Sequence, residues 1–245
     1  RYQVSVSYGA YTVLLSALLT RTVELPVSQA EQPIPVVKTY FAAPDLPGAE
    51  GDAGAEAGRM KHALDMYAAE HQVAFQVHLG DTAFTGWNQG EGFRLFAAFN
   101  VGNLEGRDIS GWVMNGGVAF AWHYVFFNGS GSENWRKVFG VRYSTDWQGG
   151  SHTVELSGDP DVAPFTKDVP QNFMLMPEED TMLLDLAYNP TVKVVAVDTY
   201  RSRPYFTYAR YGEGWAFAFE THQAVDNPQP VEQLAFNALT RALKP

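Results

Sequence analysis

The chain has 245 residues, 46% hydrophobic and 18% charged, which is enough for one large α/β domain or two small ones with a substantial core. Its formal net charge of −10 and the lack of any basic run argue against nucleic-acid binding. A small neutral ligand such as a sugar fits this charge better than a polyanion does. The absence of cysteine excludes disulfides, thiolate zinc sites and a cysteine nucleophile. The compartment stays open, with the cytoplasm marginally favoured over export.

Residues 1–33 are expected to form an N-terminal extension or an extra strand–helix unit. Residues 2–6 alternate as a strand does, residues 11–19 are compatible with a helix, and the prolines at 33 and 35 break the chain. Residues 8–19 also resemble the core of a signal peptide, but Arg21 and Glu24 separate them from the small residues at 28–30. An ordered segment is therefore favoured. No apolar stretch reaches the roughly 18 to 20 residues that span a bilayer.

A rhythm of strands and helices begins near residue 36. We expect strands at 36–41, 73–79 and 93–99, a loop at 48–58, and a helix on which Met60, Leu64 and Tyr67 share one face. A short helix capped by Asp108 precedes a buried strand at 118–124, and another helix covers 132–139.

The remaining segments add strands at 152–156 and 192–197 and a closing helix from Val231. The turn at 211–214 is typical of a hairpin between strands at 205–210 and 215–220. This order predicts a three-layer α/β sandwich with a mostly parallel sheet, a C-terminal hairpin and a helix, within a single domain at 34–245.

His123 is the leading candidate for a functional residue. It follows a predicted buried strand, and open α/β sheets bind ligands beyond the carboxyl ends of their strands. His222 follows the last predicted strand, so the two histidines would meet if the strands are neighbours. The alternatives are a structural histidine packed between Trp122 and Tyr124, and an exposed loop residue at position 222.

Residues 146–150 are expected to form a polar, flexible loop. Asp146, Trp147 and Gln148 supply a carboxylate, an aromatic ring and an amide, which is the usual equipment of a carbohydrate site, although an ordinary surface loop is an equal alternative. Asp81 is read as a turn residue, and the acidic residues 178–180 as a solvated loop. Nucleotide-binding glycine motifs and the G-x-S-x-G elbow are absent.

Four segments together resemble the ThuA-like (trehalose utilisation) family. Residues 112–123, WVMNGGVAFAWH, are similar to the family's Y-V-x-N-G-G-G-F-V-G-I-H, and residues 211–222, YGEGWAFAFETH, to its Y-G-x-G-R-V-F-Y-x-x-L-G-H. Residues 163–173, APFTKDVPQNF, are similar to H-P-I-T-x-G-L-P-x-x-F, and Gly140, Arg142 and Tyr143 match a Gly followed by an Arg–aromatic pair. The resemblance implies the flavodoxin-like architecture of class I glutamine amidotransferases and a role in sugar metabolism.

The sequence departs from the family at three histidines. Asp146 stands at the histidine of a Gly-His-Pro motif, Ala163 at that of H-P-I-T, and residues 41–44 lack an early one. A site built from several imidazoles would be depleted. Glutaminase activity is excluded because the chain has no cysteine nucleophile.

Two functions follow as hypotheses. The first is an enzyme acting on a sugar or sugar derivative, in which His123, His222 and Asp146 carry the chemistry or hold a divalent metal. Ligand contacts are expected from Trp122, Tyr124, Trp147, Asn100 and Glu220. The second is a non-catalytic carbohydrate-binding or protein-interaction module on the same fold. Packing of residues 1–33 on a neighbouring subunit would make the protein a homo-oligomer.

Overall fold

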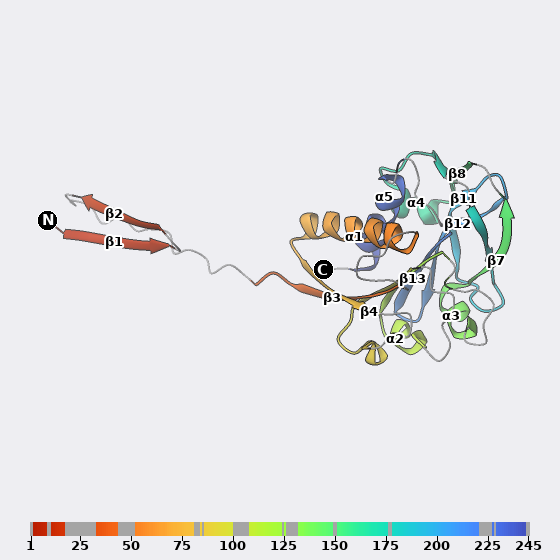
Figure 1. Cartoon of the computed structure of the whole chain (residues 1–245), viewed down its shortest axis with the longest axis horizontal. Helices are drawn as coiled ribbons and strands as arrows, with labels where there is room; N and C mark the ends of the chain where they lie inside the picture. Colours follow the sequence, from red (N-terminus) through yellow and green to blue (C-terminus); the bar gives the residue numbers. More distant parts are fainter. Residues whose placement is uncertain are drawn as a thin grey trace. The chain divides into compact units, whose positions relative to one another are not determined.

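The structure is a computed structural model of the whole chain (Figure 1). It describes residues 2–8, 11–17, 33–43, 52–80, 84, 86–99, 108–123, 125, 132–148, 151–175, 178–220, 227 and 229–243. For 2–8, 11–17, 52–53, 132, 144–148 and 178–181 it describes the backbone alone. Contacts divide the chain into two units, Arg1–Pro33 and Ile34–Pro245.

The first unit contains two antiparallel strands, β1 (Tyr2–Tyr8) and β2 (Tyr11–Ala17). The helix expected at 11–19 is therefore wrong. Tyr11, Thr12 and Val13 favour a strand, and pairing with β1 in register from Tyr8↔Tyr11 to Tyr2↔Ala17 satisfies the backbone.

The second unit alternates strands and helices along most of its length. Its strands are β3 (Val36–Ala42), β4 (Ala74–Gly80), β5 (Leu95–Phe99), β6 (Val118–Trp122), β7 (Val141–Gln148), β8 (His152–Leu156), β9 (Asn172–Leu175), β10 (Glu178–Leu184), β11 (Lys193–Asp198), β12 (Arg203–Tyr211) and β13 (Gly214–Phe219). Its helices are α1 (Asp52–His71), α2 (Ser110–Met114), α3 (Ser132–Phe139), α4 (Ala163–Thr166) and α5 (Gln229–Ala242), with 3₁₀ turns η1 (Asn88–Gly90) and η2 (Pro160–Val162).

Nine of the described strands form one sheet in the order β4-β3-β5-β6-β13-β12-β11-β8-β9. The first five are parallel, and counted along the chain their order is 2-1-3-4-5, that of flavodoxin-like folds. Beyond β13 the pairs are antiparallel, so β11 and β9 again point the same way as β13. Seven of the nine strands therefore share one direction, and the predicted fold class is confirmed.

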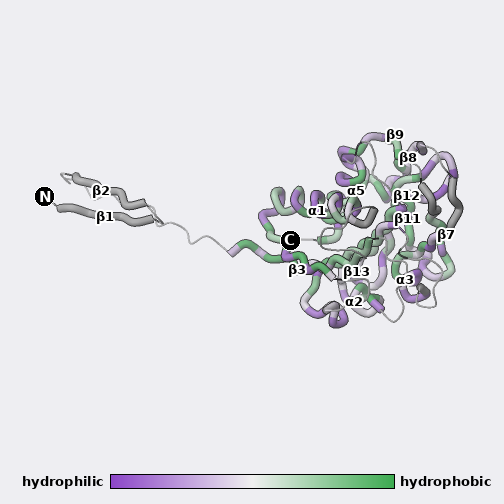
Figure 2. Tube along the Cα trace, viewed as in Figure 1, coloured by the Kyte–Doolittle hydropathy of each residue, from purple (hydrophilic) through white to green (hydrophobic). Residues whose placement is uncertain are grey.

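Helices cover both faces of the sheet, which gives three layers (Figure 1). On one face α1, α4 and α5 bury residues such as Met60, Phe165 and Leu234 against Phe120 and Phe217. The opposite face carries α2, α3 and the β7–β10 pair. Figure 2 shows hydrophobic residues concentrated along the central strands, as expected where a sheet is buried on both sides.

Three further expectations about loops are wrong. The helix α1 begins at Asp52 rather than near residue 60, because alanines and Glu56 extend the helical pattern into the expected loop. Residues 146–148 belong to β7, and residues 178–180 belong to β10. These two strands pair with each other, so backbone hydrogen bonding between distant segments overrides their polar composition.

Candidate functional site

His123 lies directly beyond the carboxyl end of β6, as predicted. All five residues of β6 are fully buried, and His123 itself is 1% exposed. Its backbone N–H donates to the carbonyl of Phe219 at 3.0 Å, and its φ is +40°. A histidine in the left-handed region is strained, and such strain clusters at functional sites.

Glu220 lies at the end of the neighbouring strand β13. The register Phe219↔Trp122 places Glu220 and His123 one residue beyond adjacent parallel strands. Glu220 is fully buried, and its Oε1 accepts a hydrogen bond from the Met182 backbone at 3.2 Å and lies 3.8 Å from the Arg201 guanidinium. The strand end therefore contains a buried carboxylate that faces a cation which is also nearly inaccessible.

Two contacts bind the β7–β10 pair to the same edge of the sheet. The hydroxyl of Tyr143 on β7 donates to the carbonyl of Phe219, which also accepts from His123. On β10, Met182 contacts Glu220. The backbone around His123 is thus bound to elements that come much later in the chain, so its conformation is fixed by tertiary contacts.

Of the other predicted site residues, one is buried in the core and several lie outside the described residues. Trp122 is fully buried and stacks on Phe219 with ring centroids 4.1 Å apart, so its ring packs in the core, and its contact with a ligand stays a prediction. Asn100, Tyr124 and His222 lie outside the described residues, as does Asp81.

Asp146 and Trp147 lie in β7, where only the backbone is described. Within the described part of the chain, no group of three or more His, Asp or Glu side chains could hold a metal ion. The predicted set of His123, His222 and Asp146 includes two side chains that are not described, so metal binding there stays a prediction.

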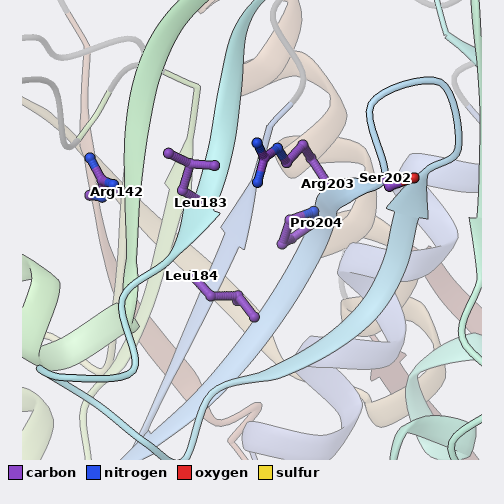
Figure 3. Close-up of a pocket in the computed structure, with 6 residues that line it drawn as sticks. All are labelled: Arg142, Leu183, Leu184, Ser202, Arg203 and Pro204. Atoms are coloured by element: carbon purple, nitrogen blue, oxygen red, sulfur yellow. The ribbon is translucent and has the colours of Figure 1, made fainter.

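A cavity of about 430 Å³ lies at this edge of the sheet (Figure 3). It is lined by Leu183 and Leu184 of β10, by Arg142 of β7, and by Ser202, Arg203 and Pro204 where β12 begins. Met182 and Arg201, the partners of Glu220, directly precede two of these segments. The cavity and the buried carboxylate therefore share the same supporting strands.

A second cavity, of about 640 Å³, lies near the amino ends of β5 and β6. The lining residues are Trp87, Gln89, Gly90, Glu91, Asp108, Gly111, Trp112 and Asn115. The partly buried Trp112 ring and several carboxylate and amide groups thus line one hollow, whereas the Trp87 ring is 2% exposed and packs in the core. Gln89 has a φ of +56°, another strained backbone, and Asn88 Nδ2 donates to Glu91 at 2.8 Å.

A buried histidine–aspartate pair was not predicted from the sequence. His152 Nδ1 lies 2.9 Å from Asp198 Oδ2, and the two side chains are 2% and 0% exposed. The other oxygen of Asp198 accepts from the Tyr200 backbone, and the Tyr200 ring stacks on the imidazole at 4.8 Å. His152 begins β8 and Asp198 ends β11, so the two side chains come together only because these strands pair in antiparallel register.

The fold is similar to those of several solved structures at low sequence identity. A protein from Bacteroides uniformis described as ThuA-like matches with a TM-score of 0.59 and 15% identity over 88% of this chain and 94% of its own. The β-galactosidase of Bacillus circulans matches with a TM-score of 0.57 and 13% identity over 84% of this chain. A cytoplasmic protein of Salmonella typhimurium LT2 matches with a TM-score of 0.52 and 11% identity, over 84% of this chain and 98% of its own.

The ThuA-like resemblance is thus confirmed at the level of the fold. The chain spans only 31% of the length of the β-galactosidase that it matches. No protein-family model matches the sequence, and no curated protein is similar to it. Among the described residues, no helix is both long enough and apolar enough to cross a bilayer.

Proposed function

We propose that the protein binds or transforms a small carbohydrate or carbohydrate derivative at the carboxyl edge of its sheet. The observation that carries the proposal is the strand order 2-1-3-4-5, in which β6 and β13 end side by side in His123 and Glu220. In open α/β sheets this edge is where ligands bind. The likeness of the fold to that of a ThuA-like protein supports a role related to sugars.

In this proposal His123 acts as the acid or base, or as a metal ligand, together with His222 and Asp146. A histidine suits the role because an imidazole can donate a proton, accept one or bind a metal. Glu220, held by Arg201 and the Met182 backbone, positions the end of β13 beside the end of β6, which carries His123. Asn100, Tyr124 and Trp147 would contact the ligand from neighbouring segments.

The test combines a panel of sugars and sugar derivatives with the substitution His123→Ala. Loss of an acid or base typically lowers kcat by about 10²- to 10⁴-fold. The control is His62→Ala, a histidine on α1 whose side chain is 57% exposed. Unchanged turnover and binding in His123→Ala for every compound that the wild type accepts would remove His123 from the site. Metal analysis of the purified protein separates the metal-ligand role from the acid–base role.

The second candidate is a non-catalytic carbohydrate-binding module, and the cavity between η1 and α2 favours it. The indole ring of Trp112 can cover a sugar face, and the carboxylates of Glu91 and Asp108 and the amide of Asn115 can bind hydroxyls. A likeness to about a third of a β-galactosidase chain fits a module of this kind. Here Glu91→Gln and Asn115→Ala would abolish sugar binding, whereas His123→Ala would leave it unchanged.

A further inference from the structure

Three arginines that are far apart in the sequence line one cavity at the amino edge of the sheet. Arg94 directly precedes β5, Arg210 belongs to β12, and Arg241 lies near the end of α5. The cavity has a volume of about 480 Å³, and its other lining residues are Glu213, Trp215 and Ala242. It lies at the end of the sheet opposite to His123, because β6 and β13 begin here.

Trp215 organises two of the three guanidinium groups. The Arg210 guanidinium lies 4.3 Å from the centroid of the indole ring, and the Arg241 guanidinium lies 5.8 Å from it. Arg210 also donates to the carbonyl of Glu213 at 3.0 Å and to that of Gly212 at 3.4 Å. Its orientation is therefore held by the turn between β12 and β13 and by the ring beneath it.

The positive charge in this cavity is not neutralised by the described carboxylates. Across the side chains that the structure describes, none of the three arginines forms an ion pair, whereas Arg136 and Arg201 do. Glu213 is the one acidic residue lining the cavity, so three guanidiniums face one carboxylate.

We propose that this cavity binds the phosphoryl group, or another doubly charged oxyanion, of a small molecule. Guanidinium groups present several donors in a planar fork that matches phosphate oxygens. Three guanidinium groups around one cavity repel one another, and a bound dianion would offset this unfavourable electrostatic energy. The indole of Trp215 adds an apolar surface beside the anion. The local charge is thus opposite to the net charge of −10 of the whole chain.

The experiment is a calorimetric titration of the full-length protein with inorganic phosphate, repeated with a phosphorylated monosaccharide and with its unphosphorylated parent. We expect one saturable site for phosphate and an equal or tighter one for the sugar phosphate. Binding should weaken with added salt, because charges near the surface are screened. Arg94→Gln and Arg241→Gln should each weaken binding by about tenfold, or about 1.4 kcal/mol.

The control is Arg142→Gln, which removes the same charge from an arginine that lines a different cavity. It should leave phosphate affinity unchanged, and all three variants should keep the circular dichroism spectrum of the wild type. Absence of saturable binding in the wild type would overturn the proposal, as would equal losses in Arg142→Gln. Phosphate binding that survives in His123→Ala separates this site from the carboxyl-edge site.

Discussion

The buried pair formed by Arg201 and Glu220 gives the sharpest test of how the candidate site is held together. Arg201 is 4% exposed and Glu220 is fully buried, with 3.8 Å between the guanidinium and Oε1. Removing one partner of a buried pair leaves the other charge in a poorly solvated position, at a cost of about 3 to 5 kcal/mol. The Met182 N–H still solvates the carboxylate, so we expect the lower end of this range for Arg201→Met.

For a domain of about 200 residues, a loss of 3 kcal/mol lowers Tm by about 6 to 12 °C. The double variant Arg201→Met with Glu220→Gln removes both charges and keeps the acceptor for Met182. It should recover at least about 1 kcal/mol relative to the single variant, because the buried carboxylate that faced Arg201 loses its charge as well. Urea unfolding followed by fluorescence gives the three free energies.

A matched control is Lys61→Met, which breaks the ion pair with Asp65 on α1, where both side chains are more than 60% exposed. Its effect should be a small fraction of that of Arg201→Met, because exposed pairs contribute little. A double variant no more stable than Arg201→Met would show that the two charges do not interact, and the argument would fail.

Three other predictions concern the framework. Gly117→Ala should lower the unfolding free energy by about 1 to 3 kcal/mol in urea denaturation, because its Cβ would lie 2.5 Å from the Trp112 ring. Gly58→Ala on α1 is the matched control. It should raise the unfolding free energy by about 0.5 to 1 kcal/mol, because the space around Gly58 is open. Trp122→Ala should cost about 3 to 5 kcal/mol in the same assay, and a cost under 1 kcal/mol would place that ring outside the core. Burial raises the pKa of the Tyr67 hydroxyl above its usual value of 10.0. As the pH rises, the hydroxyl therefore loses its proton in the unfolded chain before it does so in the folded chain. The free energy of unfolding should consequently fall from about pH 10 up to the pKa of the folded state. Tyr67→Phe should reduce that decline above about pH 10, and an unchanged slope would exclude Tyr67 as its source.

The parts of the fold that depend on local pattern could be predicted from the sequence. The apolar run of β6, the glycine after α3 and the turn between β12 and β13 all have short-range signals, and each lies where it was expected. The strand β2 and the β7–β10 pair were missed because their strand character comes from pairing between segments. Many residues of β7 and β10 are polar, and the apolar spacing of β2 also fits a helix, although its first residues favour a strand.

The candidate site also contains one residue that could be predicted from the sequence and several pairs that could not. His123 could be predicted because it follows a buried strand by one residue. The Arg201–Glu220 pair, the His152–Asp198 pair and the three-arginine cavity could not, because each joins residues whose approach depends on sheet register. The net charge of −10 gives no sign of the three-arginine cavity, because it sums over the whole chain and says nothing of local charge.

The most direct test of the proposed function is a crystal structure of the protein with the carbohydrate or derivative that the binding panel identifies. The account predicts that the ligand lies beyond the ends of β6 and β13, in contact with His123. A ligand in the cavity between η1 and α2, with His123 untouched, would contradict it and would identify the protein as a binding module.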